Sequence, residues 1–224
     1  MGLPQGSALS PILFRIYVMD LVADLSKRKD ITLLKFADDG TVKASAETTA
    51  LCVEKISTIL STVHQWSRKN RMVINCMPNK TEVIGFSTAE NNMDLIPASF
   101  TLGYSTIKRV NHTKVLGLII DDKLNFDEHS KSVYNKLLGI WATICKHSNR
   151  HWGFKQHTLV QIIKVLWLPT LFYAGHLWIT AKNTKEINSL FYKLCKSTIG
   201  AVFNIRQSVA EVIVGIPPLL ITNA

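Results

Sequence analysis

The chain has 224 residues, of which 47% are hydrophobic and 19% are charged. This composition excludes an intrinsically disordered protein and allows one sizeable core with a smaller second one. Lys and Arg outnumber Asp and Glu by 26 to 16, which favours a polyanionic partner such as nucleic acid, although many basic proteins bind none.

The first segment predicts a loop followed by a helix. Gly2–Ser7 is the loop, Ser10 can cap a helix, and Pro11 suits the first helical turn. Apolar residues then recur at helical spacing until the polar segment 27–30: Leu13, Ile16, Tyr17, Leu21 and Leu25.

The next segment predicts a β-hairpin with two carboxylates at its tip. Residues 31–36 are β-prone, 37–40 carry turn chemistry with Asp38 and Asp39, and 41–44 can return as the partner strand. A helix that must pack on something, most simply this hairpin, follows with one apolar stripe: Ile56, Ile59, Leu60, Val63 and Trp66.

Short strands are predicted at 72–75, 81–86, 100–102 and 114–120, so the fold class is α+β. Beyond residue 125 the pattern becomes helical, since 125–128 resembles a capping arrangement. Residues 126–224 also hold 11 Lys and Arg against 4 Asp and Glu. We therefore predict one domain over 1–125 and a basic, all-helical one over 126–224.

Residues 165–181 form the one segment that suggests a membrane span. It is uncharged but contains Pro169 and His176, and it is shorter than the roughly 20 apolar residues that a span needs. We expect buried helix and turn there, and no membrane partner.

Adjacent carboxylates at a tight turn after an apolar strand can hold a hard cation such as Mg²⁺. Two such ions can activate an attacking hydroxyl and stabilise the leaving oxygen. Because neighbouring side chains of a strand face opposite ways, Asp38 is the principal candidate ligand and Asp39 the second. As an isolated match, Asp-Asp-Gly is more often a solvated turn.

The match is not isolated. Four blocks of the sequence follow one another in the order and rough spacing found in reverse transcriptases of non-LTR retrotransposons: Gly2–Pro11, Phe36–Asp39, Lys80–Thr81 and Leu116–Gly117. The chain resembles this family, and jockey-like elements in particular, since Gly215–Leu219 is similar to a segment downstream of their polymerase domain. The long block that contains Pro-Gln-Gly-Ser is the most specific of these.

The resemblance implies the second half of a polymerase palm, an antiparallel sheet packed on helices, followed by a helical thumb. It implies two Mg²⁺ ions held partly by Asp38 and Asp39, and Lys80 near the departing pyrophosphate. It implies primer contact at Leu116 and Gly117. Template and incoming nucleotide would contact the loop Pro4, Gln5, Gly6 and Ser7, where glycine allows close backbone approach. Each assignment has a structural alternative: a plain turn for the loop 4–7, a surface lysine for Lys80, and an ordinary bulge for Leu116 and Gly117.

Basic residues of the first thumb helix can follow a sugar-phosphate backbone, although a solvated helix face explains them nearly as well: Lys131, Lys136, Lys146 and Arg150. Zinc binding is not expected at the Cys and His residues nearby, because their spacing matches no common site: Cys145, His147, His151 and His157. Asp121 and Asp122 precede a helix start and suggest a solvated turn.

The family pattern includes fingers and a further aspartate on a strand ahead of the Pro-Gln-Gly loop. These are expected to lie outside this sequence, as is an endonuclease domain, so we expect the isolated chain not to polymerise. The implied partners are an RNA template, a DNA primer or RNA–DNA duplex, and deoxynucleoside triphosphates. The expected location is intracellular and reducing, in nucleus and cytoplasm.

Three alternatives stay open. The first is a nucleic-acid-binding remnant without catalysis, and the second is an inert remnant that binds nothing specifically. Group II intron and retron reverse transcriptases share the aspartate pair and the Pro-Gln-Gly loop, but the thumb-side resemblance argues against them. The oligomeric state is not predicted.

Overall fold

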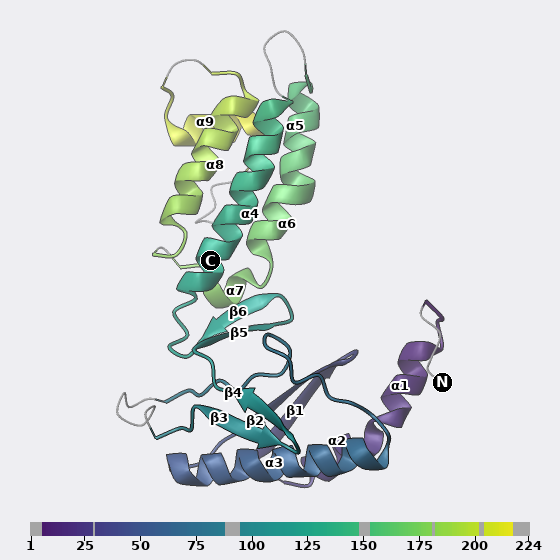
Figure 1. Cartoon of the computed structure of the whole chain (residues 1–224). Coiled ribbons are helices and arrows are strands. Elements are labelled where there is room, and N and C mark those ends of the chain that lie inside the picture. The colour runs from purple at the N-terminus through teal and green to yellow at the C-terminus, as the bar shows by residue number, and fades with distance from the viewer. Residues whose placement is uncertain are drawn as a thin grey trace. The chain divides into compact units, whose positions relative to one another are not determined.

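The structure is a computed structural model that describes residues 6–28, 30–87, 95–147, 153–180, 182–201 and 204–216. The chain divides into two compact units, Met1–Leu116 and Gly117–Ala224, and each is described by itself. The predicted α+β class is confirmed, with small antiparallel sheets and helices in the first unit and helices throughout most of the second (Figure 1). The predicted domain boundary near residue 125 stays a prediction.

The first unit combines helices with short antiparallel hairpins. Its hydrophobic core is small and centres on Leu25, Ile31 and Ile59, which bring the second helix, the first strand and the third helix together. The elements are α1 (Ser10–Tyr17), α2 (Met19–Ser26), β1 (Ile31–Phe36), β2 (Asp39–Ala44), α3 (Thr49–Lys69), β3 (Ser99–Leu102), β4 (Ser105–Lys108) and β5 (His112–Val115).

The β1–β2 hairpin has one packed face and one open face. Its antiparallel register pairs Ile31 with Ala44 and Phe36 with Asp39, so alternate residues share a face. The face with Ile31 packs on α2 and α3. On the opposite face, Leu34 and Phe36 are 62% and 66% exposed. The hairpin therefore presents an apolar, uncovered surface next to its tip.

Helix α3 is the long element against which the rest of the first unit packs, and Figure 1 shows it running along one side of the hairpins. Thr48 caps its start by accepting the backbone N–H of Leu51. At the β3–β4 turn, Gly103 has φ of +61°, and a Cβ there would stand 2.1 Å from the His64 ring of α3. Only glycine fits this close approach.

The second unit is a helical bundle that follows one strand. Its core centres on fully buried aromatic and aliphatic side chains, with the Trp167 and Phe191 rings stacked 5.0 Å apart. The elements are β6 (Leu118–Asp121), α4 (Asp127–Lys146), α5 (Gln156–Ile162), the π-helix η2 (Ile163–Trp167), α6 (Leu168–Phe172), α7 (Gly175–Trp178), α8 (Lys185–Thr198) and α9 (Gln207–Val214).

The π-helical turn η2 follows from the spacing of the buried residues. Leu159, Ile163, Trp167 and Leu171 are all buried and lie four residues apart. In an α-helix of 3.6 residues per turn, a four-residue repeat drifts around the axis. A wider π turn offsets that drift and keeps this row facing the core.

Several predicted elements differ from the structure. The single helix predicted from Pro11 to the polar segment 27–30 is two helices, because a turn at Val18, whose side chain is buried, separates them. Ser10 is the first residue of α1 and not its cap. Residues 72–75 form no strand, and 81–86 contribute one isolated bridge at Val83, since turns and side chains satisfy much of the backbone there.

Of the remaining strand predictions, one is confirmed and one is wrong. The strand at 100–102 is confirmed within β3, whereas β4 was not predicted. The single strand predicted at 114–120 is the hairpin β5–β6, because the chain turns at Leu116 and Gly117. The division between the two units falls within this turn.

Candidate functional site

The two candidate carboxylates lie at the tip of the β1–β2 hairpin, as predicted, but the turn is tighter than expected. Ala37 and Asp38 form it, and Asp39 already pairs with Phe36 as the first residue of β2. Ala37 has φ of +52°, a left-handed conformation that a tight hairpin turn requires. Both aspartates are exposed, so both carboxylates are available to a ligand.

Helix α1 contacts the hairpin close to this tip. The Nζ atom of Lys35 lies 4.4 Å from the centre of the Phe14 ring, a cation–π geometry. Partial burial lowers the pKa of Lys35, and the negative charge of Asp38 opposes that shift. Lys35 thus sits within electrostatic reach of Asp38 and joins the tip to the helix that follows the predicted template loop.

The described part of that loop is Gly6 and Ser7, while Pro4 and Gln5 lie outside the described residues. Gly6 has φ of +83°, and the Ser7 hydroxyl accepts the Leu9 backbone N–H at 3.3 Å. Helix α1 is anchored at its other end, where the Tyr17 hydroxyl donates to the Asn70 carbonyl. The Trp66 indole N–H donates to Asp20 at 2.7 Å and holds the start of α2 in the same way.

Lys80 lies in an exposed turn after α3. Its backbone N–H donates to the Met77 carbonyl, and the neighbouring Asn79 N–H donates to Glu82. Asn79 has φ of +64°, typical of a tight turn. Whether Lys80 and the hairpin tip form one site stays a prediction.

The candidate metal ligands at the hairpin tip are the carboxylates of Asp38 and Asp39. No group of three or more His, Cys, Asp or Glu side chains gathers within the part of the chain that the structure describes. Asp38 and Asp39 supply oxygen ligands of the kind that Mg²⁺ prefers, which fits the metal in type but falls short of a full protein ligand set.

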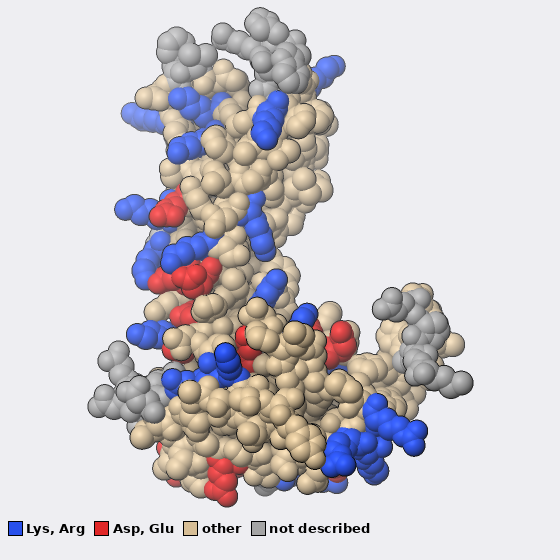
Figure 2. All heavy atoms as spheres, viewed as in Figure 1, with Lys and Arg blue, Asp and Glu red and all other residues tan. Residues whose placement is uncertain are grey.

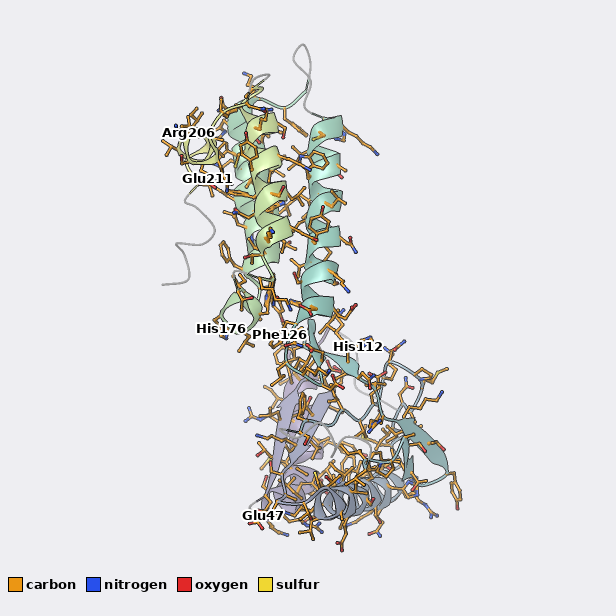
Figure 3. All side chains as sticks on the ribbon, turned by 90° about the vertical axis from the view of Figure 1, so that its left-hand side faces the viewer. Glu47, His112, Phe126, His176, Arg206 and Glu211 are labelled. Carbon is orange, nitrogen blue, oxygen red and sulfur yellow. The ribbon has the colours of Figure 1, made fainter. Side chains whose placement is uncertain are left out.

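A shallow hollow occurs at the other end of the same hairpin and contains none of the predicted residues. Asp30, Glu47 and Lys55 line it, and Figure 3 shows Glu47 at that end of the first unit. The Lys55 ammonium contacts the Asp30 carboxylate at 2.7 Å and the Ser45 carbonyl at 2.9 Å. The charges of Lys55 and Asp30 therefore satisfy one another.

The predicted primer-contact residues form the turn between β5 and β6. Leu116 and Gly117 have φ of +48° and +90°, so both adopt left-handed conformations, and Leu116 is half exposed. A Cβ on Gly117 would lie 3.4 Å from the Tyr173 ring. The glycine allows the turn conformation, and the half-exposed tyrosine of the helical unit lies against it.

Sequence reasoning missed His129, which stands next to this turn. Its ring is 3% exposed, and its Nδ1 atom accepts the backbone N–H of Ile119 in β6 at 3.2 Å. The ring also meets Trp178 edge-on at 5.0 Å. Burial lowers the pKa of His129, and the charge of Lys136 lowers it further. The available signal was a histidine four residues before Val133, on the apolar face of the helix.

The four predicted thumb cations differ in their surroundings. Lys131 contacts Glu128 at 2.8 Å, and this hydrogen bond raises the pKa of Lys131. Lys136 and Lys146 are exposed on α4 and have no ion pair among the described residues, and Arg150 lies outside them. Figure 2 shows Lys and Arg side chains along the length of the helical unit on the face in view.

Of the acidic pair Asp121 and Asp122, Asp121 has a local structural role. The Asp121 carboxylate accepts the backbone N–H groups of Asn125 and Phe126 at 2.9 and 2.7 Å, just ahead of α4. The predicted capping by 125–128 is therefore wrong, because Phe126 occupies the cap position with φ of +58° and Asp121 binds the free amides.

The four cysteines carry free thiols. Burial, and then the charge of Glu211, raises the pKa of Cys195 to about 12, and burial raises the pKa of Cys145. The His147 ring lies against the Thr143 carbonyl and the Phe154 ring. His157 is exposed on α5, and His151 lies outside the described residues.

Across the described ranges, every helix is too short or too polar to cross a membrane. Within 165–181, Trp167, Leu171 and Trp178 are buried in the helical core, whereas Val165 and Tyr173 are more than half exposed. The segment is therefore helix and turn with a buried face, as predicted.

Comparison with known proteins gives a consistent family. A family model described as "Reverse transcriptase (RNA-dependent DNA polymerase)" matches residues 1–120. The chain is 22% identical, over 93% of its length, to the "Retrovirus-related Pol polyprotein from type-1 retrotransposable element R1" of Bradysia coprophila. It is 25% identical, over 97% of its length, to the "RNA-directed DNA polymerase from mobile element jockey" of Drosophila melanogaster.

A third relative is the "Probable RNA-directed DNA polymerase from transposon X-element" of Drosophila melanogaster, 24% identical over 92% of this chain. The matches cover 20%, 24% and 22% of the R1, jockey and X-element proteins, so the chain spans about a fifth to a quarter of these curated relatives. No solved structure matches the chain.

The buried His129 predicts a pH dependence of stability. Its folded pKa lies below the ordinary histidine value of 6.5, so only the unfolded chain takes up this proton as pH first falls below 6.5. The stabilising contribution is fully present above that pH and is lost below it. Thermal unfolding should show a lower Tm at acidic pH, and this loss should be smaller in His129→Asn. An equal loss in both proteins would contradict the assignment.

Proposed function

Because the chain belongs to the reverse transcriptase (RNA-dependent DNA polymerase) family, we propose that Asp38 and Asp39 are metal-binding carboxylates of nucleotidyl transfer to a primer 3′-hydroxyl. The observation that carries the proposal is the pair of exposed aspartates at the tip of a hairpin whose other face is packed. A carboxylate pair fixed at an open tip can meet a cation and a triphosphate together.

Asp38 and Asp39 would hold Mg²⁺, which when bound activates the primer hydroxyl and neutralises charge on the phosphates. The residues of the chain then have distinct roles. The Gly6–Ser7 loop and α1 would border the incoming nucleotide and RNA template, and Lys80 would neutralise the departing pyrophosphate. The open face of the hairpin, with Leu34 and Phe36, would lie beside the reacting strands.

The helical unit would hold the RNA–DNA duplex that polymerisation produces. Lys136 and Lys146 support this role, since they are exposed cations on one helix without an ion pair in the described residues. Such ammonium groups can neutralise phosphates and release counterions. Lys131 is a weaker candidate, because Glu128 already pairs with it. Leu116 and Gly117 would contact the primer.

A second candidate function is binding of nucleic acid without catalysis. It is favoured by the observation that the described residues bring together two neighbouring carboxylates and no third acidic, histidine or cysteine ligand. The two candidates share the helical unit and differ only at the hairpin tip, so experiments on Asp38 separate them. For either function we propose an intracellular, reducing location in nucleus and cytoplasm, which the four free thiols support.

The metal assignment is tested with Mn²⁺ as a paramagnetic stand-in for Mg²⁺. Titration with Mn²⁺ and a deoxynucleoside triphosphate should broaden the NMR signals of residues 37–40, because the ion would sit at the hairpin tip. Asp38→Asn should remove the effect. Asp30→Asn is the matched control, since Asp30 is an exposed aspartate at the opposite end of the hairpin. Broadening centred on Asp30, or no broadening at the tip, would contradict the metal assignment to Asp38 and Asp39.

Primer extension by the isolated 224-residue chain should be undetectable. Two carboxylates alone leave the metal ions short of ligands and the nucleotide poorly positioned. The measurement uses purified chain, an RNA template, an annealed DNA primer and Mg²⁺. Robust extension that disappears in Asp38→Asn would instead show a complete active site within these 224 residues.

Lysine substitutions test the binding role of the helical unit. Lys136→Ala and Lys146→Ala should each weaken binding to an RNA–DNA duplex and reduce the slope of log affinity against log salt by about one. Lys131→Ala is the matched control, and its effect should be smaller because Glu128 already neutralises it. Equal effects of all three changes would mean that the helix contributes only general charge.

A further inference from the structure

We propose that His129 is the positioning residue of the primer-contact turn, a role that rests on the function proposed above. The turn itself is Leu116 and Gly117, and the first residues after it are the start of strand β6. The geometry that supports the proposal lies within the second unit. It links the rings of His129, Trp178 and Tyr173 to one another and to Gly117 and Ile119.

The first contact is the hydrogen bond from the Ile119 N–H to Nδ1 of His129, 3.2 Å long. The histidine accepts this N–H and so links strand β6 directly to α4.

The second contact holds the histidine itself. Trp178 of α7 is fully buried, meets the His129 ring edge-on at 5.0 Å, and donates its indole N–H to the Tyr173 carbonyl at 3.1 Å. Tyr173 in turn lies against Gly117. The same tryptophan thus fixes both the histidine that binds β6 and the tyrosine beside the turn.

The surrounding connections make this end of the helical unit stiff. Asn183 donates from its side chain to the carbonyls of Trp178 and Asn125, and its own carbonyl accepts the Ser130 hydroxyl. The start of α4 and the segment after α7 are therefore joined on both sides of His129. Figure 3 shows Phe126 and His176, which mark these two elements, at the same end of the helical unit.

Core stability alone does not account for a histidine here. With Nδ1 accepting, the proton resides on Nε2, and that buried atom has no hydrogen-bond partner among the described residues. The ring therefore satisfies one partly buried backbone N–H and leaves its own buried N–H unsatisfied. The histidine instead sets the position of β6, because its hydrogen bond fixes this strand next to the turn against α4, the helix that carries Lys136.

Two conservative substitutions separate this role from packing. An Asn side chain places its amide oxygen near the position of Nδ1, whereas Gln places its oxygen near that of Nε2. His129→Asn should therefore keep the bond to Ile119 and His129→Gln should lose it. We expect amide exchange at Ile119 to be about tenfold faster in His129→Gln than in the wild-type chain or His129→Asn.

The functional readout is affinity of the whole chain for an RNA–DNA duplex. His129→Gln should bind about fivefold more weakly than the wild-type chain, with His129→Asn restoring affinity. The slope of log affinity against log salt should be the same in all three proteins, because no phosphate contact is lost. A merely structural role would lower Tm in both variants without this split in affinity.

Each outcome decides the proposal. Faster exchange at Ile119 with unchanged affinity overturns it, as does unchanged exchange in His129→Gln. A third outcome is that the wild-type chain binds no duplex, while His129→Asn and His129→Gln still differ in Ile119 exchange. The hydrogen bond would then be confirmed, but the proposed function, and with it the positioning role, would be wrong. A circular dichroism melt of each variant confirms that the comparison is between folded proteins.

Discussion

The two-sided β1–β2 hairpin is the constraint on which the candidate site depends. Ile31 packs with Leu25 and Ile59, and that burial fixes which face of the hairpin is covered. Since a strand alternates its side chains, the register then places Leu34, Phe36 and Asp39 on the uncovered face. A slip of one residue would turn these side chains into the core, so a three-residue cluster determines where the second carboxylate points.

Local patterning was enough to predict the hairpin tip and the long helix after it, because alternation and helical spacing both reflect burial of one face. The same logic predicted helix at α1 but did not show whether its apolar side chains are covered. Leu13, Ile16 and Tyr17 recur at helical spacing, yet the helix has no buried residue. A periodic stripe predicts that a helix is amphipathic, whereas whether anything covers the stripe is a tertiary property.

Among the site residues, too, local interactions could be predicted from sequence and tertiary ones could not. Lys131 and Glu128 are three residues apart on one helix, so their ion pair could have been predicted and the cations ranked from sequence. For His129, its place on the apolar face of the helix could have indicated burial. Its partner could not have been predicted, because that partner is the backbone N–H of Ile119, which any residue there would carry. The π turn at 163–167 was in principle predictable, because buried residues four apart do not fit a regular α-helix.

The Leu116–Gly117 turn has two properties that each lower the stability of the fold: a leucine with positive φ and the exposure of that leucine. Two successive residues adopt positive φ, for which Asn-Gly or Gly-Gly is the usual sequence, and a leucine in that conformation costs about 1 kcal/mol. This leucine is also half exposed, so burial offsets little of that cost. The surrounding contacts from His129 to Ile119 and from Tyr173 to Gly117 hold the following residues in place. Backbone strain of this kind is often found at functional segments, which fits the primer contact proposed for Leu116 and Gly117.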